Sequence, residues 1–342
     1  MNSPDASGQR EPLPEAIREA RIYVAGHRGL VGSAMLRALN AGGCRRLITR
    51  SHAELELTDS AAVEQFFAAE RPEIVLLCAA KVGGIAANNA YPAEFIHVNL
   101  SIQSNVIHAA WKSGVQRLLF LGSSCIYPRD CPQPIREEYL LTGPLEATNR
   151  PYAIAKIAGV EMCWSYNRQY ATRYLALMPT NLYGPGDNYD LESSHVLPAL
   201  IRKCHEAKVT GADRVQAWGS GTPRRELLYS GDLADAVLFL LGLDDARLGG
   251  CFNDHRPPLI NVGSGQDVTI AELVDRVKAI VDYQGDVAWD RSRDDGTPQK
   301  LLDVSTLQAL GWRFKTPLDE GIRLAYEDFL AHWAGQGQRE DA

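Results

Sequence analysis

Short apolar runs alternate with amphipathic segments along the first half of the chain. Four short runs predict strands at 21–25, 46–49, 74–80 and 117–121, and the apolar run 74–80 is typical of a strand buried on both faces of a sheet. Apolar residues at helical spacing predict helices over 33–39, over the segment that contains Val63, Phe66 and Phe67, and over 95–113. This alternation predicts an α/β fold with a Rossmann-type, doubly wound parallel sheet.

The second half of the chain is less regular. Strands are predicted at 175–181 and 259–262, and a helix opens at 229–236. The stretch 183–225 is rich in Gly and Pro and predicts loops. After Thr269, two helical patterns lie around the segment 294–300.

These patterns predict two interleaved domains. Residues 20–185, with returning elements near 226–265, form the Rossmann domain in this interpretation. Residues 186–335 mainly form a smaller α/β domain, which we expect to bind the substrate. Residues 1–19 are polar, with acidic residues and prolines and no apolar core, so we predict a flexible tail and not a secretory signal.

Composition excludes several classes of protein. The 342 residues are 45% hydrophobic and 23% charged, which is typical of a soluble globular protein. The net charge of -7 argues against a general nucleic-acid binder, and no apolar run reaches the length of a membrane span. The seven cysteines are scattered without paired CxxC motifs, so we expect no metal site, no disulfide framework and a reducing cytoplasm.

A glycine motif lies between the first predicted strand and the first predicted helix. Gly26, Gly29 and Gly32 have GxxGxxG spacing. Such spacing permits a tight turn and brings the backbone close to a pyrophosphate at the helix N-terminus. The alternative is a plain strand-to-helix turn, but the position directly after the first strand favours a dinucleotide-binding loop.

The end of the second predicted strand indicates which dinucleotide binds. NAD-binding folds usually carry Asp or Glu near this position, where the side chain holds the ribose 2′-hydroxyl. Here Arg50, together with Arg28 in the glycine loop, offers cations for a 2′-phosphate. We therefore predict that the chain binds NADP(H) and not NAD. The alternative is that Arg50 is simply a solvated loop residue.

Tyr152 and Lys156 form a second motif. Pro151 is typical of a helix start, so the phenol and the ammonium share one helical face. A cation favours the phenolate, and lowering a Tyr pKa from about 10 to about 7 requires roughly 4 kcal/mol. Many solvated helix faces carry such a pair, but here Ser123 and Ser124 follow a parallel strand and are candidate carbonyl clamps.

These motifs together resemble the extended short-chain dehydrogenase/reductase family. The resemblance is carried by GxxGxxG at 26–32, by Ser123 four residues before Tyr127, and by YxxxK at 152–156. Within the family, the chain is similar to the NADPH-dependent epimerase-reductases of GDP-4-keto-6-deoxy-D-mannose, from about Arg21 to the last helix. The most specific stretches are 25–29, 80–85, 122–128, 151–159, 178–185 and 295–298.

The resemblance implies a role for each matching residue. The implied catalytic residues are Ser123, Tyr152 and Lys156 for reduction and Cys125 and His195 for epimerisation. The implied NADP(H)-binding residues are Gly26, His27, Arg28, Gly29, Leu30, Val31, Gly32, Arg50, Ala79, Ala80, Lys81, Leu121, Gly122, Ser123, Ser124, Tyr152, Lys156, Pro179, Asn181, Leu182 and His195. The implied GDP-sugar-binding residues are Ser123, Cys125, Asn181, Lys203, Trp218, Arg225 and Asp295. Lys203 stands where an Arg is expected, which keeps the charge but not the bidentate fork. A homodimer through a helix pair is usual among relatives.

One oxygen-binding site suits both reactions of such an enzyme. The protons on C3 and C5 of a 4-keto sugar lie alpha to the C4 carbonyl, so removing either one builds negative charge on the C4 oxygen. Hydride delivery to C4 builds charge on the same oxygen. The hydroxyls of Ser123 and Tyr152, backed by the charge of Lys156, can therefore stabilise both kinds of transition state.

Epimerisation also needs a base and an acid on opposite faces of the sugar. A thiol with a pKa of about 8.5 and an imidazole with a pKa of about 6.5 bracket neutral pH. We predict Cys125 as the base and His195 as the acid, and the reverse assignment at one of the two carbons stays open. The structural alternatives are a buried thiol, a capping or core histidine and, for Trp218, core packing.

Two other functions remain open from the sequence. One is a related nucleotide-sugar epimerase or reductase, such as an enzyme that forms GDP-colitose. The other is a catalytically silent NADP(H)-binding sensor, which the presence of both Tyr152 and Lys156 disfavours. The preference for guanine over other bases depends on the resemblance alone.

Overall fold

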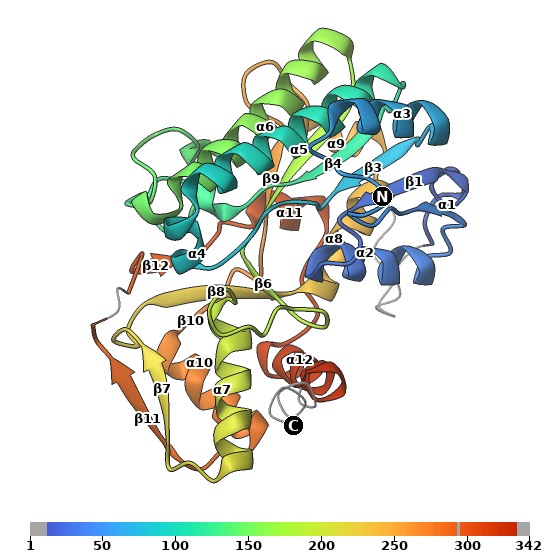
Figure 1. The fold of residues 1–342 in the computed structure, drawn as a ribbon. Helices are drawn as coiled ribbons and strands as arrows, with labels where there is room; N and C mark the ends of the chain where they lie inside the picture. Colours follow the sequence, from blue (N-terminus) through green and yellow to red (C-terminus); the bar gives the residue numbers. More distant parts are fainter. Residues whose placement is uncertain (1–11, 293–294, 334–342) are drawn as a thin grey trace.

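A six-stranded parallel sheet forms the centre of the upper lobe in Figure 1. The structure, a computed structural model, describes residues 12–292 and 295–333. In spatial order the strands are β2 (Arg46–Ile48), β1 (Arg21–Ala25), β3 (Ile74–Leu77), β4 (Arg117–Leu121), β5 (Arg173–Pro179) and β9 (Leu259–Val262). All neighbouring strands are parallel, and the strand order reverses between β1 and β3. The predicted doubly wound fold is therefore confirmed.

Helices cover both faces of this sheet. The helices α2 (Leu30–Ala41) and α8 (Ser230–Gly242) pack on one face, and α3 (Ser60–Glu70), α5 (Pro92–Lys112) and α6 (Arg150–Tyr170) pack on the other. Successive strand residues point to opposite faces, so Ile22 and Val24 join the first core while Tyr23 joins the second. Burial on both faces explains why β1, β3 and β4 are nearly continuous apolar runs, whereas β2 at the edge of the sheet begins with the exposed Arg46.

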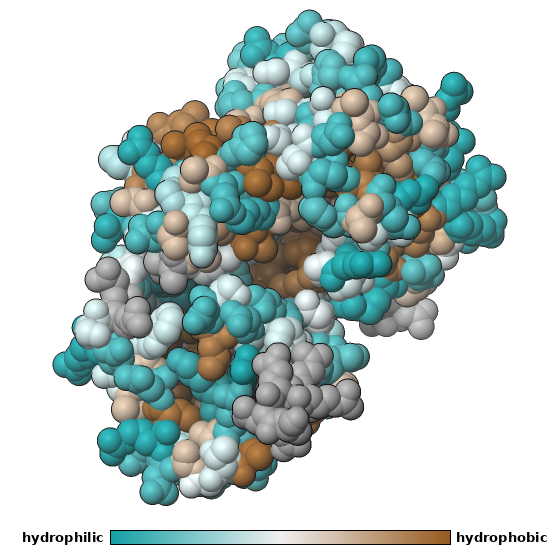
Figure 2. All heavy atoms as spheres, in the orientation of Figure 1, coloured by the Kyte–Doolittle hydropathy of each residue, from teal (hydrophilic) through white to brown (hydrophobic). Residues whose placement is uncertain are grey.

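The lower lobe in Figure 1 packs three helices against short strands. The helices are α7 (Val196–Thr210), α10 (Ile270–Val281) and α12 (Leu318–His332). The strand β8 (Arg224–Tyr229) pairs with β6 (Asn181–Tyr183), β10 (Asp267–Thr269) and β12 (Gln299–Lys300), and β7 (Arg214–Trp218) pairs with β11 (Asp286–Asp290). Because α8 and β9 return to the upper lobe, the chain passes between the lobes more than once. Figure 2 shows a hollow between the two lobes with hydrophobic side chains in its depth.

The remaining elements are short. They are α1 (Glu15–Glu19), α4 (Ile85–Ala90), α9 (Asp245–Leu248), α11 (Ser305–Leu310) and 3₁₀ turns at Ser124–Ile126, Glu137–Tyr139, Ala147–Asn149 and Gly249–Cys251. Among the helices in the described residues, none combines the length and the apolar character needed to cross a membrane.

The prediction of loops over 183–225 is wrong for much of this stretch, because the stretch contains α7, β7 and the start of β8. The proline at 198 misled the prediction. It lies in the first turn of α7, where a backbone N–H has no helical partner to lose. Leu197, Ile201 and Cys204 have helical spacing and are buried, so the signal for α7 was present in the pattern. The strands β11 and β12 and a third helix after Thr269 were also not predicted.

The predicted tail at 1–19 is too long. Residues 1–11 lie outside the described part of the chain. From Leu13 onward the chain is packed, because Leu13 and Ile17 are buried in the same core cluster as Leu39 of α2 and Leu238 of α8. The helix α1 is a single turn with one buried apolar residue, Ile17, which is too short for a clear periodic signal, so it depends on packing in the core shared with α2 and α8.

Candidate active site

The carboxyl ends of the central strands gather most of the predicted site residues. Gly26 follows β1, Arg50 lies beyond β2, Ala79 lies beyond β3, Ser123 lies beyond β4 and Asn181 follows β5. In doubly wound sheets this edge is where ligands bind. The strand β6 begins directly after β5 and pairs with β8, so the same edge faces the lower lobe.

The glycine loop has the geometry of a phosphate cradle. Gly26 has a φ of +82°, and a Cβ built on it would lie 2.7 Å from the backbone nitrogen of Ala79. A Cβ on Gly32 would lie 2.1 Å from the Gly26 carbonyl oxygen. Only glycine fits at either position. The N-terminus of α2 has no side-chain cap, and Nδ1 of His27 is buried without a hydrogen-bond partner. These donors fit a pyrophosphate at the helix N-terminus.

Arg28 and Arg50, the two cations predicted to bind the 2′-phosphate, both lie near the carboxylate of Glu54. Arg50 forms an ion pair with Glu70, and its Nη1 donates to the Thr49 carbonyl oxygen at 2.7 Å. Both Arg50 and the exposed Arg28 act electrostatically on Glu54. Glu70 therefore orients Arg50 beside the glycine loop and would share it with a phosphate.

Lys156 ties the helix α6 to the sheet. It is 3% exposed, and its Nζ donates to the Leu121 carbonyl oxygen at 2.7 Å. The same Nζ lies 5.8 Å from the ring centre of Tyr152. Burial lowers the pKa of Lys156 to about 8, so the ammonium is still charged at neutral pH. Lys156 thus holds Tyr152 beside the residues that follow β4.

The pKa of Tyr152 moves in the direction opposite to our expectation. Burial of the phenol raises its pKa above the ordinary value, the charge of the Cys125 sulfur adds to this, and a hydrogen bond with Ser123 acts against it. We expected the charge of Lys156 to lower this pKa. The Lys156 ammonium instead donates to the Leu121 carbonyl oxygen, and the desolvation of the phenolate is a larger effect than the attraction of that charge. Tyr152 is therefore a protonated phenol at neutral pH, which is the form that can donate a proton.

Cys125 lies between hydrogen-bond donors from three parts of the chain. Its Sγ accepts from Nδ2 of Asn149 at 3.2 Å and from Nζ of Lys300 at 3.4 Å. Its backbone N–H donates to Oγ of Ser123 at 3.2 Å. Burial alone would raise the pKa of this thiol, but the charge of Lys300 and hydrogen bonds from Ser123, Lys300 and Asn149 bring it below the ordinary value. Sequence reasoning missed Asn149 and Lys300.

His195 lies at the start of α7, and part of its surface is accessible to solvent. Desolvation by the many protein atoms around the imidazole, together with the charge of Lys300, lowers the pKa of His195. The structure therefore brings Cys125 and His195 under the influence of the same lysine. In this structure His195 is neither a core residue nor a side-chain cap, because it makes no capping hydrogen bond to α7.

Four of the predicted substrate residues, Lys203, Trp218, Arg225 and Asp295, lie on the lower lobe. Lys203 donates to the Gln216 carbonyl oxygen at 3.1 Å, and its Nζ lies 4.9 Å from the ring centre of Trp218. Trp218 is 47% exposed, so core packing does not explain it. A cation beside an exposed aromatic face suits a ligand that carries both a phosphate and a flat base.

Asp295 forms hydrogen bonds with both Ser220 and Arg225. Its carboxylate accepts from the backbone N–H and from the hydroxyl of Ser220, both at 2.7 Å. Its carbonyl oxygen accepts from Arg225 at 3.2 Å. The predicted substrate residues Arg225 and Asp295 are therefore adjacent, and Asp295 holds the loop that follows Trp218.

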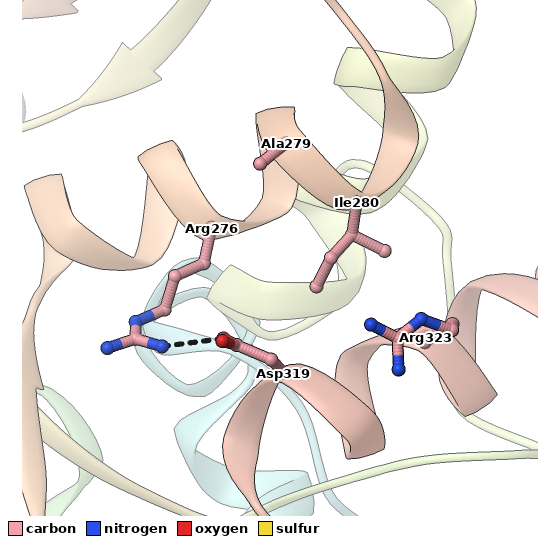
Figure 3. A pocket seen from close by; sticks show the side chains of 5 residues that line it. All are labelled: Arg276, Ala279, Ile280, Asp319 and Arg323. Carbon is pink, nitrogen blue, oxygen red and sulfur yellow. Dashed lines mark hydrogen bonds and ion pairs between the residues drawn. The ribbon is translucent and has the colours of Figure 1, made fainter.

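A pocket of about 410 Å³ lies elsewhere, between α10 and α12 (Figure 3). Its lining residues are Arg276, Ala279, Ile280, Asp319 and Arg323. Arg276 and Asp319 form an ion pair at 2.6 Å, as Figure 3 shows. None of these is a predicted site residue. Among the described residues, no group of three or more His, Cys, Asp or Glu side chains has an arrangement that would hold a metal ion.

Several known proteins are similar to this chain over most of its length. The NAD dependent epimerase/dehydratase family matches residues 22–253. A protein of Arabidopsis thaliana named putative GDP-L-fucose synthase 2 is 55% identical over 313 residues, which span 92% of each chain. The GDP-L-fucose synthase of Escherichia coli strain K12 is 51% identical over 316 residues, which span 92% of this chain and 98% of the relative. The solved structure of a GDP-L-fucose synthetase from Naegleria fowleri bound to NADP has a TM-score of 0.81 at 27% identity, over 92% of this chain and 95% of that one.

Proposed function

This chain belongs to the NAD dependent epimerase/dehydratase family, and from that premise we propose that it converts GDP-4-keto-6-deoxy-D-mannose to GDP-L-fucose with NADP(H). The observation that carries this proposal is identity of 50% or more to several GDP-L-fucose synthases over 92% of the chain. The reaction inverts C3 and C5 of the sugar and then reduces C4. The enzyme is thus an oxidoreductase with epimerase activity.

The residues present fit the cofactor. The glycine loop and the uncapped N-terminus of α2 would hold the pyrophosphate, and Arg28 and Arg50 would hold the 2′-phosphate. When bound, NADPH supplies the hydride for C4. Lys156 and the backbone after β4 would position the nicotinamide end beside Tyr152.

Epimerisation uses the oxygen site and the proton-exchange pair. We place the C4 carbonyl oxygen of the sugar between the hydroxyls of Ser123 and Tyr152. A base then takes the proton from C3 or C5, the electron pair of the C–H bond moves to the C4 oxygen, and the two hydroxyls stabilise the enolate. Return of a proton to the opposite face inverts the carbon. Cys125 and His195 are the proton-exchanging groups.

Reduction uses the same oxygen site. As C4 is reduced, its oxygen gains negative charge and takes a proton from the Tyr152 phenol. The raised pKa of Tyr152 keeps that proton on the phenol at neutral pH. The buried Lys156 ammonium, 5.8 Å from the ring, then stabilises the phenolate that remains.

An assay with the purified protein tests this function. We expect NADPH oxidation with GDP-4-keto-6-deoxy-D-mannose, incorporation of solvent deuterium at C3 and C5, and a product with the stereochemistry of L-fucose. A product reduced at C4 without inversion at both carbons would indicate a related nucleotide-sugar reductase. Intact NADPH binding without turnover of any keto sugar would favour the sensor.

We also propose the homodimer, the cytoplasmic location and the two-domain division stated above for the sequence. The cysteines are all free thiols, which suits a reducing compartment, and cell fractionation tests the location. A chain in which residues 20–185 are joined directly to residues 226–265 should still bind NADPH, and loss of that binding would contradict the division.

The dimer is supported by an aromatic group on the neighbouring helices α5 and α6. Trp111 and Tyr170 stack with ring centres 4.2 Å apart, and Tyr170 is 40% exposed. Exposed aromatic side chains are enriched in interfaces. We expect light scattering to give twice the mass of the chain, and Tyr170→Glu to shift the protein toward monomers because it buries a charge in the interface. A wild-type protein that elutes as a monomer at micromolar concentration would contradict the dimer.

A further inference from the structure

Lys300 contacts the sulfur of Cys125, although 175 residues separate them in the chain. Its Nζ lies 3.4 Å from Sγ, and Asn149 approaches the same sulfur at 3.2 Å from another side. Both groups are donors, and an ammonium has no acceptor atom. A thiol has one weak proton to share, whereas a thiolate accepts from several donors, so this environment suits the thiolate.

The position of Lys300 is fixed on the side of β12 that faces Cys125. Neighbouring residues of a strand point to opposite sides, and Gln299 is turned toward Asp267, to which it donates at 2.6 Å. The strand itself pairs with β8 through Arg225. Just after it, Leu302 donates its backbone N–H to the buried carboxylate of Glu226 at 2.8 Å. The lysine therefore reaches the thiol from a backbone that is held on both sides.

The other ionisable groups around Cys125 do not supply this charge. Tyr152 on α6 is a neutral phenol at neutral pH, as described above. His195 at the start of α7 has a lowered pKa, and the thiol of Cys131 on the following loop has a raised pKa because it is buried. The ammonium of Lys156 is directed to the Leu121 carbonyl. Lys300 is the cation in contact with the sulfur within the described residues.

We propose that Lys300 is a positioning residue that keeps Cys125 as a thiolate and thereby makes it the base of epimerisation. The inference rests on the proposed epimerase function. In this step the sulfur forms an S–H bond as a C–H bond of the sugar breaks, and the electron pair of that bond goes to the C4 oxygen. Lys300 keeps its own proton throughout. Its charge also disfavours protonation of His195, so the imidazolium, when formed, gives its proton up readily.

The pH dependence of Cys125 alkylation by iodoacetamide tests the proposal on the protein without substrate. Mass spectrometry of the peptide that contains Cys125 separates its reaction from those of the other cysteines. We expect Lys300→Met to move the midpoint upward by at least about one pH unit, which lowers the reaction rate at neutral pH about tenfold. Lys300→Arg keeps the charge and should restore most of the rate. Lys112→Met, which removes an exposed lysine on α5, is the matched control and should leave the profile unchanged.

Turnover provides the second readout. With Lys300→Met, deuterium incorporation at C3 and C5 should fall at least tenfold in kcat and recover as the pH is raised, because the thiolate then forms without the lysine. An unchanged alkylation profile in Lys300→Met, with a raised KM for the GDP-sugar, would overturn the proposal and make Lys300 a substrate contact. Failure of the wild-type protein to exchange deuterium would instead refute the epimerase function, while the alkylation profile would still report on Lys300.

Discussion

Replacement of Tyr152 by Phe should lower both NADPH oxidation and deuterium incorporation by about 10²- to 10⁴-fold, which is the typical contribution of a positioned general acid. The reason is that hydride delivery to C4 and proton removal from C3 or C5 all place negative charge on the C4 oxygen. Phe keeps the ring, which packs edge-on against Phe95 with centres 6.3 Å apart. The loss would therefore come from the hydroxyl and not from a cavity.

The measurement follows NADPH absorbance and deuterium at C3 and C5 in the same reaction. Tyr170→Phe is the matched control, since it removes a hydroxyl from a 40% exposed side chain in the last turn of the same helix. It should retain wild-type rates. If Tyr152→Phe abolished reduction but left deuterium exchange at the normal rate, the two reactions would not share one oxygen site.

The second large effect is expected for Cys125→Ser, which should suppress deuterium incorporation by about 10²- to 10⁴-fold and NADPH oxidation much less. A serine hydroxyl is a far weaker acid than a thiol, so the charge of Lys300 at 3.4 Å cannot keep it ionised at neutral pH. The oxygen site of Ser123 and Tyr152 is untouched, and reduction at C4 does not need the thiol. The product should therefore keep the starting configuration at C3 and C5.

Cys131→Ser is the control for this variant. The thiol of Cys131 lies six residues further on and also senses the charge of Lys300, but it has a raised pKa because it is buried. Exchange rates of Cys131→Ser should match those of the wild type. Normal deuterium incorporation in Cys125→Ser would show that Cys125 is a structural thiol, which is the alternative that the sequence left open.

Much of the upper lobe could be predicted because its signals are local. The strands at 21–25 and 117–121 have the predicted limits, since parallel strands buried on both faces read as continuous apolar runs. The glycine loop was also recognisable, because a φ of +82° at Gly26 and the close approach of Gly32 to Gly26 leave no room for a side chain. Such steric demands restrict single positions and are visible without knowledge of the rest of the fold.

The lower lobe was harder to predict. The helix α7 was assigned to a loop because of Pro198, although a proline in a first turn is compatible with a helix. The strands β11 and β12 are short, and β12 has only two residues. Short strands are defined by their partners, which lie far away in the chain, so propensity within a few residues cannot reveal them.

The sequence by itself determined the doubly wound sheet, the glycine loop and the pairing of Tyr152 with Lys156, because each depends on residues that are close in the chain. Only the tertiary structure decided that Lys300 and Asn149 meet at the sulfur of Cys125 and that the pKa of Tyr152 rises. The physical reason is that charge and desolvation act through space. Their sign at a given atom depends on which distant segments the fold brings against it.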